Sequence, residues 1–168
     1  MTCVAADLRD ILLAVAALAD GYAVAIDILY MRIHADGEVA LAAELCDAGR
    51  TFLRQLPLTR NERQDYRLEE IGKHCLIGDE GVAVVHEVGR RFKEAIAMHT
   101  THAFYHDDLL EGFFTAQPLA TLDALCGGDA DALASGVALL QNLSRRKNVI
   151  ALVSDDTLLA WCDAEPAS

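Results

Sequence analysis

The sequence predicts an all-α fold of about nine short-to-medium helices, packed as an irregular bundle or as a short stack of antiparallel helical hairpins. Apolar residues recur at spacings of three and four along almost the whole chain, which is the period of an amphipathic helix. The breaks in this pattern fall at Gly, Pro and Asp, and they are short enough to make neighbouring helices pack against each other. With 168 residues, the chain is expected to form a single helical domain over residues 1–168, with its apolar stripes in one core.

Four helices are expected in the first half of the chain, over residues 7–19, 22–34, 38–55 and 59–75. The first has one apolar face, made of Leu8, Ile11, Leu12, Val15 and Leu18. The second is apolar around nearly its whole circumference, which is typical of a helix that packs centrally. Pro57 ends the third helix, because proline cannot continue it. Thr59 and Glu62 then form a capping-box pattern that opens the fourth.

Five more helices are expected in the second half, over residues 79–98, 102–116, 118–126, 131–147 and 155–162, the fourth of which finishes in Arg145-Arg146-Lys147. The period of Val85, Val88, Phe92 and Ile96 is too long for a strand and favours a helix. Either Asp129 or Asp131 caps the helix whose inner stripe is Leu133, Val137, Leu140 and Leu143, and Ser154-Asp155 caps the last. Residues 149–153 remain open between extended chain and helix. Phe92 and Leu140 are expected in the core.

Composition excludes several classes of protein. The chain carries 14 Lys+Arg against 26 Asp+Glu, for a net charge of −12, so we expect it to bind neither nucleic acid nor an anionic membrane surface. A hydrophobic fraction of 53% argues against disorder. The longest uncharged stretch near the N-terminus, Ile11 to Ala19, is too short to cross a bilayer, and the basic start of a secretory signal is missing. A cytoplasmic location is therefore expected.

The cysteines fit the same location. Five of them are widely spaced, without a Cys-x-x-Cys pair, which disfavours a disulfide framework. Four lie within apolar helical patterns and are interpreted as reduced thiols that act as small hydrophobic residues: Cys46, Cys75, Cys126 and Cys162.

No nucleotide-binding, phosphate-loop or nucleophile-elbow motif occurs, so an enzyme is not favoured and no cofactor is expected. One cluster leaves a metal site open as an alternative. On a continuous helix His99, His102 and His106 would share a face, and His102 with His106 could bind a metal such as zinc. Thr100-Thr101 has the character of a helix cap, which would separate His99 from the other two.

Asp27 suggests a second alternative, because it lies within the most apolar helix. A buried carboxylate needs a partner or a raised pKa. A structural partner such as Arg32 is favoured. The alternative is a helix-lined pocket near Asp27 and Tyr30 that serves a small-molecule binder or an enzyme.

Charge is distributed unevenly along the chain. No Lys or Arg lies between Glu94 and Leu143, which makes that stretch acidic. Five arginines surround the turn at Pro57, and we expect them to contact a protein partner: Arg50, Arg54, Arg60, Arg63 and Arg67. The competing structural interpretation is neutralisation by nearby acids, namely Glu62, Asp65, Glu69 and Glu70.

The C-terminal half carries a family resemblance. Its motifs are Gln117-Pro118-Leu119, Leu122-Asp123-Ala124-Leu125 and the run from Asp155-Asp156 through Leu158-Leu159-Ala160-Trp161-Cys162-Asp163. Residues 80–165 resemble the HEAT-like helical C-terminal regions of large bacterial proteins, which are often attached to nucleotide-binding or defence-type modules. The resemblance implies a HEAT-like stack with a protein-interaction or scaffold role, and it transfers no functional residue. A non-enzymatic interaction module with a protein partner is therefore the expected function.

Overall fold

The computed structural model describes residues 2–35, 40–58, 65–143 and 148–164. Within these ranges the chain forms nine α-helices, two 3-10 helices and no strand, which confirms the all-α prediction. The elements are α1 Thr2–Ala16, α2 Gly21–Ala35, α3 Ala43–Gln55, α4 Asp65–Cys75, α5 Asp79–Ala97, η1 Ala103–Tyr105, α6 Asp107–Ala116, α7 Pro118–Cys126, α8 Ala130–Leu143, η2 Val149–Leu152 and α9 Asp155–Ala164. None of the described helices is both long and apolar enough to span a membrane.

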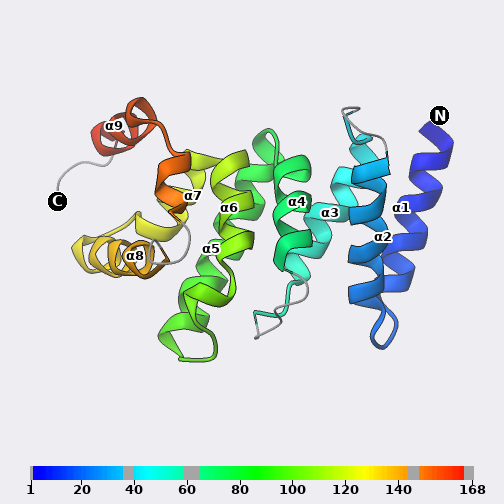
Figure 1. Cartoon of the computed structure of the whole chain (residues 1–168), viewed down its shortest axis with the longest axis horizontal. Helices are drawn as coiled ribbons and strands as arrows, with labels where there is room; N and C mark the ends of the chain where they lie inside the picture. Colours follow the sequence, from blue (N-terminus) through cyan, green and yellow to red (C-terminus); the bar gives the residue numbers. More distant parts are fainter. Residues whose placement is uncertain (1, 36–39, 59–64, 144–147, 165–168) are drawn as a thin grey trace.

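The helices follow one another along the long axis of the molecule, with α1 at one end and α8 and α9 at the other (Figure 1). α1, α3, α5 and α7 contact one another in succession, and so do α2, α4 and α6. α1 also packs against α2, and α3 packs against α4. The first two hairpins therefore stack side by side, and within the described chain α1 and α2 form the N-terminal end of the stack.

The buried apolar side chains form two neighbouring clusters, so the expectation of a single core is wrong. α6 contributes to both, because Leu109 and Phe113 belong to the N-terminal cluster whereas Leu110 and Phe114 belong to the C-terminal one. α5 divides in the same way: Val84, Val85 and Val88 belong to the first cluster, and Phe92 belongs to the second. These two helices thus hold the halves of the molecule together. The expected burial of Phe92 and Leu140 is confirmed.

Most helix ends lie near the expected positions, and two of the caps can be assigned. Asp129, rather than Asp131, caps α8, since its Oδ1 accepts a hydrogen bond from the Ala132 N–H at 2.9 Å. Ser154 caps α9 through its hydroxyl, which accepts the Thr157 N–H at 3.2 Å. Thr59 and Glu62 lie outside the described residues, and so does the helix end expected at Arg145-Arg146-Lys147.

Three segments differ from expectation. α3 begins at Ala43, later than residue 38, and a 3-10 turn replaces the first helical turn expected after residue 102. The segment 149–153, which the sequence left open between extended chain and helix, forms the 3-10 helix η2 over Val149–Leu152, and Val153 follows it. Leu133 and Val137 of α8, which were expected inside, are exposed.

Candidate functional site

An apolar surface lies on the outer side of the N-terminal hairpin. Its six large side chains are exposed; they are Val4 and Ile11 of α1, Leu18 of the turn that follows α1, and Val24, Ile28 and Met31 of α2. We call these six residues the end face. Two expectations fail here: Ile11 and Leu18 do not belong to the core, and α2 is not a central helix. Both errors have one cause, which is that α1 and α2 end the stack and bury only the sides that meet each other, α3 and α4.

The two helices present the end face away from their neighbours in the stack. On α1, Leu12 is buried and Leu8 and Val15 pack against the core, whereas Val4 and Ile11 are exposed. Two residues along a helix correspond to a rotation of about 200°. On α2, Tyr30 packs its ring against Tyr66 of α4, and by the same rotation Ile28 lies almost opposite.

The exposed residues of α2 have the spacing of a helix–helix seam. Val24, Ile28, Met31 and Ala35 follow one another at intervals of four, three and four, and all four are exposed. This is the a/d pattern by which apolar side chains of one helix insert between those of another. Val4 and Ile11 of α1 and Leu18 of the following turn recur every seven residues, and the exposed Asp7 lies between Val4 and Ile11 on the same side of α1. No helix of the described chain packs on this seam.

The described arginines around Pro57 pair with acids of their own chain. Arg50 is only 11% exposed; it donates to the Cys75 carbonyl oxygen at 3.2 Å and contacts Glu80 at 2.5 Å. Arg54 pairs with Glu87 at 3.1 Å. Arg60 and Arg63 lie outside the described residues. Intramolecular pairing supports the structural interpretation of these charges, although the acids involved differ from those expected from the sequence.

The last of the five arginines explains Asp27. Arg67 Nη1 lies 2.6 Å from Asp27 Oδ1, so the partner of this carboxylate comes from α4 and not from Arg32. The Asp27 side chain is also partly exposed, so it is not an isolated buried charge. It lines neither of the two cavities described for this structure, which involve residues 93–142 and 122–162. The pocket near Asp27 and Tyr30 stays a prediction.

The three histidines of the metal hypothesis do not converge. His106 is buried, with its Nε2 2.9 Å from the Thr101 hydroxyl and its ring edge-on to Phe92. His102 is exposed and packs against Tyr105. His99 has φ 57° beyond the end of α5, where the Thr100 N–H bonds the Ala95 carbonyl at 2.9 Å, as in a helix C-terminal cap. The helix end expected at Thr100-Thr101 is therefore present, and it separates His99 from His102 and His106.

His99 and His102 instead line an open groove between the C-terminal end of α5, η1 and α8. Its volume is about 1030 Å³, and most of its walls are small or aliphatic side chains such as Ala97, Ala138 and Leu139. Glu94 and Asp131 bring negative charge to the groove, and Lys93 brings a positive one. The size suits a small ligand or a peptide segment.

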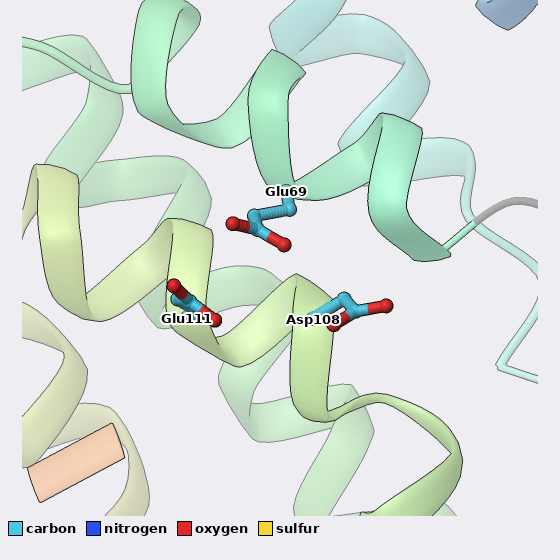
Figure 2. A group of neighbouring side chains, drawn as sticks. All are labelled: Glu69, Asp108 and Glu111. Carbon is cyan, nitrogen blue, oxygen red and sulfur yellow. The ribbon is translucent and has the colours of Figure 1, made fainter. Parts of the chain in front are cut away.

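Three carboxylates approach one another where α4 crosses α6: Glu69, Asp108 and Glu111, with ligand atoms within 4.8 Å of one another (Figure 2). The helices come this close because Gly112 has no side chain; a Cβ there would lie 2.6 Å from the Glu69 carbonyl oxygen. Lys73 binds Glu69 at 2.5 Å and Glu70 at 3.1 Å, and so supplies a cation on the α4 side. Carboxylate oxygens are the ligands of hard cations, but an acidic cluster with its own lysine carries no metal assignment.

Two cysteines meet between α3 and α4, an arrangement that sequence reasoning missed. Cys46 Sγ lies 3.6 Å from the His74 carbonyl oxygen, next to Cys75. The hydrogen bond from the Cys75 thiol lowers the pKa of Cys46 to about 7, and the positive charge of Arg50 acts in the same direction against the effect of burial. The same hydrogen bond, together with burial, raises the pKa of Cys75 well above its usual value. Cys162, expected inside, is exposed.

A signal for this pair exists in the sequence of α3. Cys46, Gly49 and Arg50 are spaced i, i+3 and i+4, which places them on one face of the helix. The spacing gives no indication that the opposing residue is Cys75, because the two cysteines are far apart in the chain.

Comparisons with protein-family models, with curated proteins and with solved structures found no match.

Proposed function

We propose that this chain is a non-enzymatic protein-interaction module that associates through the end face, and that its partner there is a second copy of the same chain. The observation that carries the proposal is the exposed a/d seam of α2, at the end of the helical stack. This function keeps the interaction role expected from the sequence and places it on a different surface from the arginines.

The composition of α2 supports a covered face. A helix that is apolar all round is stable in water when both of its sides are packed, and α2 is packed by its own chain on one side only. Stacks of helical hairpins stay monomeric when their terminal helices carry polar outer faces. Here the terminal hairpin exposes six large apolar side chains instead, and contiguous patches of this kind mark interaction sites.

The spacing supports a helical partner. Residues that alternate at intervals of three and four fit between the side chains of another helix, whereas a strand or an extended peptide would match a period of two. Two hairpins that meet face to face would form a four-helix bundle, with α1 and α2 of each copy contributing an apolar seam.

A second copy suits the face better than a partner selected by charge. Val24, Ile28, Met31 and Ala35 carry no charge, so the α2 side of the surface offers nothing that would select an oppositely charged protein; the exposed charge on the α1 side is that of Asp7, which lies between Val4 and Ile11. A two-fold axis lets the same patch serve both sides of an interface.

The size of the face is compatible with a reversible dimer. α1 and α2 have 15 residues each, so the two helices present about 22 Å by 20 Å. Side chains that protrude make the accessible area larger than this flat footprint. The flat footprints of two copies add up to about 880 Å², which lies in the range below about 1,200 Å² that is typical of weak, reversible complexes.

The test compares two methionines of equal exposure. Met31 lies in the end face and Met98 lies beyond α5, and both are 68% exposed. We expect Met31→Glu to weaken self-association at least about tenfold, because the interface would bury an unpaired charge. Met98→Glu is the matched control and should behave as the unaltered chain. Light scattering coupled to size-exclusion chromatography measures the mass across a range of concentrations.

The outcomes separate clearly. Dimers of the unaltered chain and of Met98→Glu, with a monomeric Met31→Glu that keeps its helical circular dichroism, support the proposal. A chain that is monomeric at every concentration contradicts it. Dimers that persist unchanged in Met31→Glu would place the interface elsewhere and contradict the end face.

A further inference from the structure

We infer that Cys46 and Cys75 form a redox-active thiol pair, in which a hydroperoxide oxidises Cys46 and Cys75 then closes a disulfide between α3 and α4. This inference is independent of the proposed self-association, because it rests on a different pair of helices.

Close approach of the two helices brings the thiols together. A Cβ built at Gly49 would lie 2.5 Å from Cys75 Sγ and 3.0 Å from Cys75 Cβ, so the side chain of Cys75 lies directly on the α3 backbone. Cys46 is one helical turn before Gly49 and faces the same way. Cys46 Sγ lies 3.6 Å from the carbonyl oxygen of His74, the residue before Cys75, so the two cysteines meet at this crossing. A disulfide requires Cβ atoms about 3.5–4.5 Å apart, which only such a close crossing provides.

The surroundings assign different roles to the two sulfurs. Cys46 is partly exposed, so a small oxidant can reach it, whereas Cys75 is buried. Arg50 is anchored beside the pair by the Cys75 carbonyl oxygen and by Glu80. Its charge and the Cys75 thiol together favour the thiolate of Cys46, which is the form that attacks peroxides. Cys46 is therefore the peroxide-reactive sulfur, and Cys75 is the resolving one.

The reaction balances in two steps. The Cys46 thiolate attacks one peroxide oxygen, so that an S–O bond forms, the O–O bond breaks and the departing oxygen takes up a proton to leave as water or an alcohol. Cys46 is now a sulfenic acid. The Cys75 sulfur then attacks the Cys46 sulfur, the S–S bond forms, and the hydroxyl leaves with the Cys75 proton as water. Two thiols are oxidised and one hydroperoxide is reduced.

The test uses the full chain and hydrogen peroxide as the probe. After treatment with an equimolar amount, free thiols are alkylated and the peptides are mapped by mass spectrometry with and without dithiothreitol. We expect a peptide pair that joins Cys46 to Cys75, lighter than the two reduced peptides by two hydrogens and separated by dithiothreitol. Circular dichroism recorded in parallel checks that the chain stays helical.

Variants test the roles of the individual residues. In Cys75→Ser we expect Cys46 to accumulate as sulfenic and then sulfinic acid, because the resolving thiol is gone. Arg50→Gln should slow oxidation of Cys46 several-fold at neutral pH, and Arg50→Lys should restore most of the rate. Arg54→Gln, which removes a charge from the same helix where it pairs with Glu87, is the matched control and should leave the rate unchanged.

Three results would overturn the inference. One is a folded chain in which Cys46 remains fully alkylatable after peroxide treatment. Another is a Cys46–Cys75 link that forms only in denaturant. The third is an oxidation rate that Arg50→Gln and Arg54→Gln change equally.

Discussion

At the scale of single residues, the packing of this protein depends on positions that have no side chain. Because Gly49 has no side chain, the Cys75 side chain of α4 can pack directly on the α3 backbone. In the same way, the α4 backbone at Glu69 can pack directly on Gly112 of α6. Each of these glycines brings chemically active groups together, thiols in the first case and carboxylates in the second. The chemistry of both clusters is thus a consequence of how closely the helices cross.

Two glycines of the α4–α6 crossing should respond oppositely to alanine. At Gly112 a Cβ would overlap the Glu69 backbone at 2.6 Å, so Gly112→Ala should lower the free energy of unfolding by about 1–3 kcal/mol through overpacking. At Gly72 the nearest atom to a Cβ is 3.4 Å away, so Gly72→Ala should be neutral or stabilising by up to about 1 kcal/mol, from helix propensity. Urea unfolding followed by circular dichroism measures both. Equal effects of the two substitutions would contradict the close crossing.

At the scale of helices, local pattern was enough to find the elements but not their neighbours. The nine helices follow from apolar period, Pro118 and the caps at Asp129 and Ser154, all of which act within a few residues. Position in the stack depends on contacts between distant residues, and for that reason the apolar α2 was mistaken for a central helix. The same limit hid the partner of Asp27 and the Cys46–Cys75 pair, whose members lie on different helices.

The second hydrophobic cluster should depend on α5 more than on α9. Phe92 is the buried α5 residue of that cluster, which also contains buried side chains of α6 and α7. Phe92→Ala should therefore lower the free energy of unfolding by about 3–5 kcal/mol. Leu159 of α9 is 63% exposed, so Leu159→Ala should change it by less than about 0.5 kcal/mol. Chemical denaturation of the two variants and the unaltered chain measures the difference. A loss below about 0.5 kcal/mol in Phe92→Ala would contradict its place in the cluster.

At the scale of the whole molecule, the acidic charge and the apolar end face act against each other. Each copy has a net charge of −12, so two copies repel, while the proposed interface at the end face would be stabilised by burial of apolar side chains. Salt screens the repulsion, since the Debye length falls from about 10 Å at 0.1 M to about 3 Å at 1 M. Self-association should therefore become tighter as salt is added, the opposite of an interface built on ion pairs.

Sedimentation equilibrium of the unaltered chain, at several concentrations and at low and high salt, tests the end face most directly. The account predicts a mass that rises with concentration from 18.2 kDa toward twice that value, with a dissociation constant that decreases as salt increases. A mass of 18.2 kDa under all of these conditions would contradict it. So would a dimer that dissociates as salt is added, because charge rather than apolar burial would then hold the copies together.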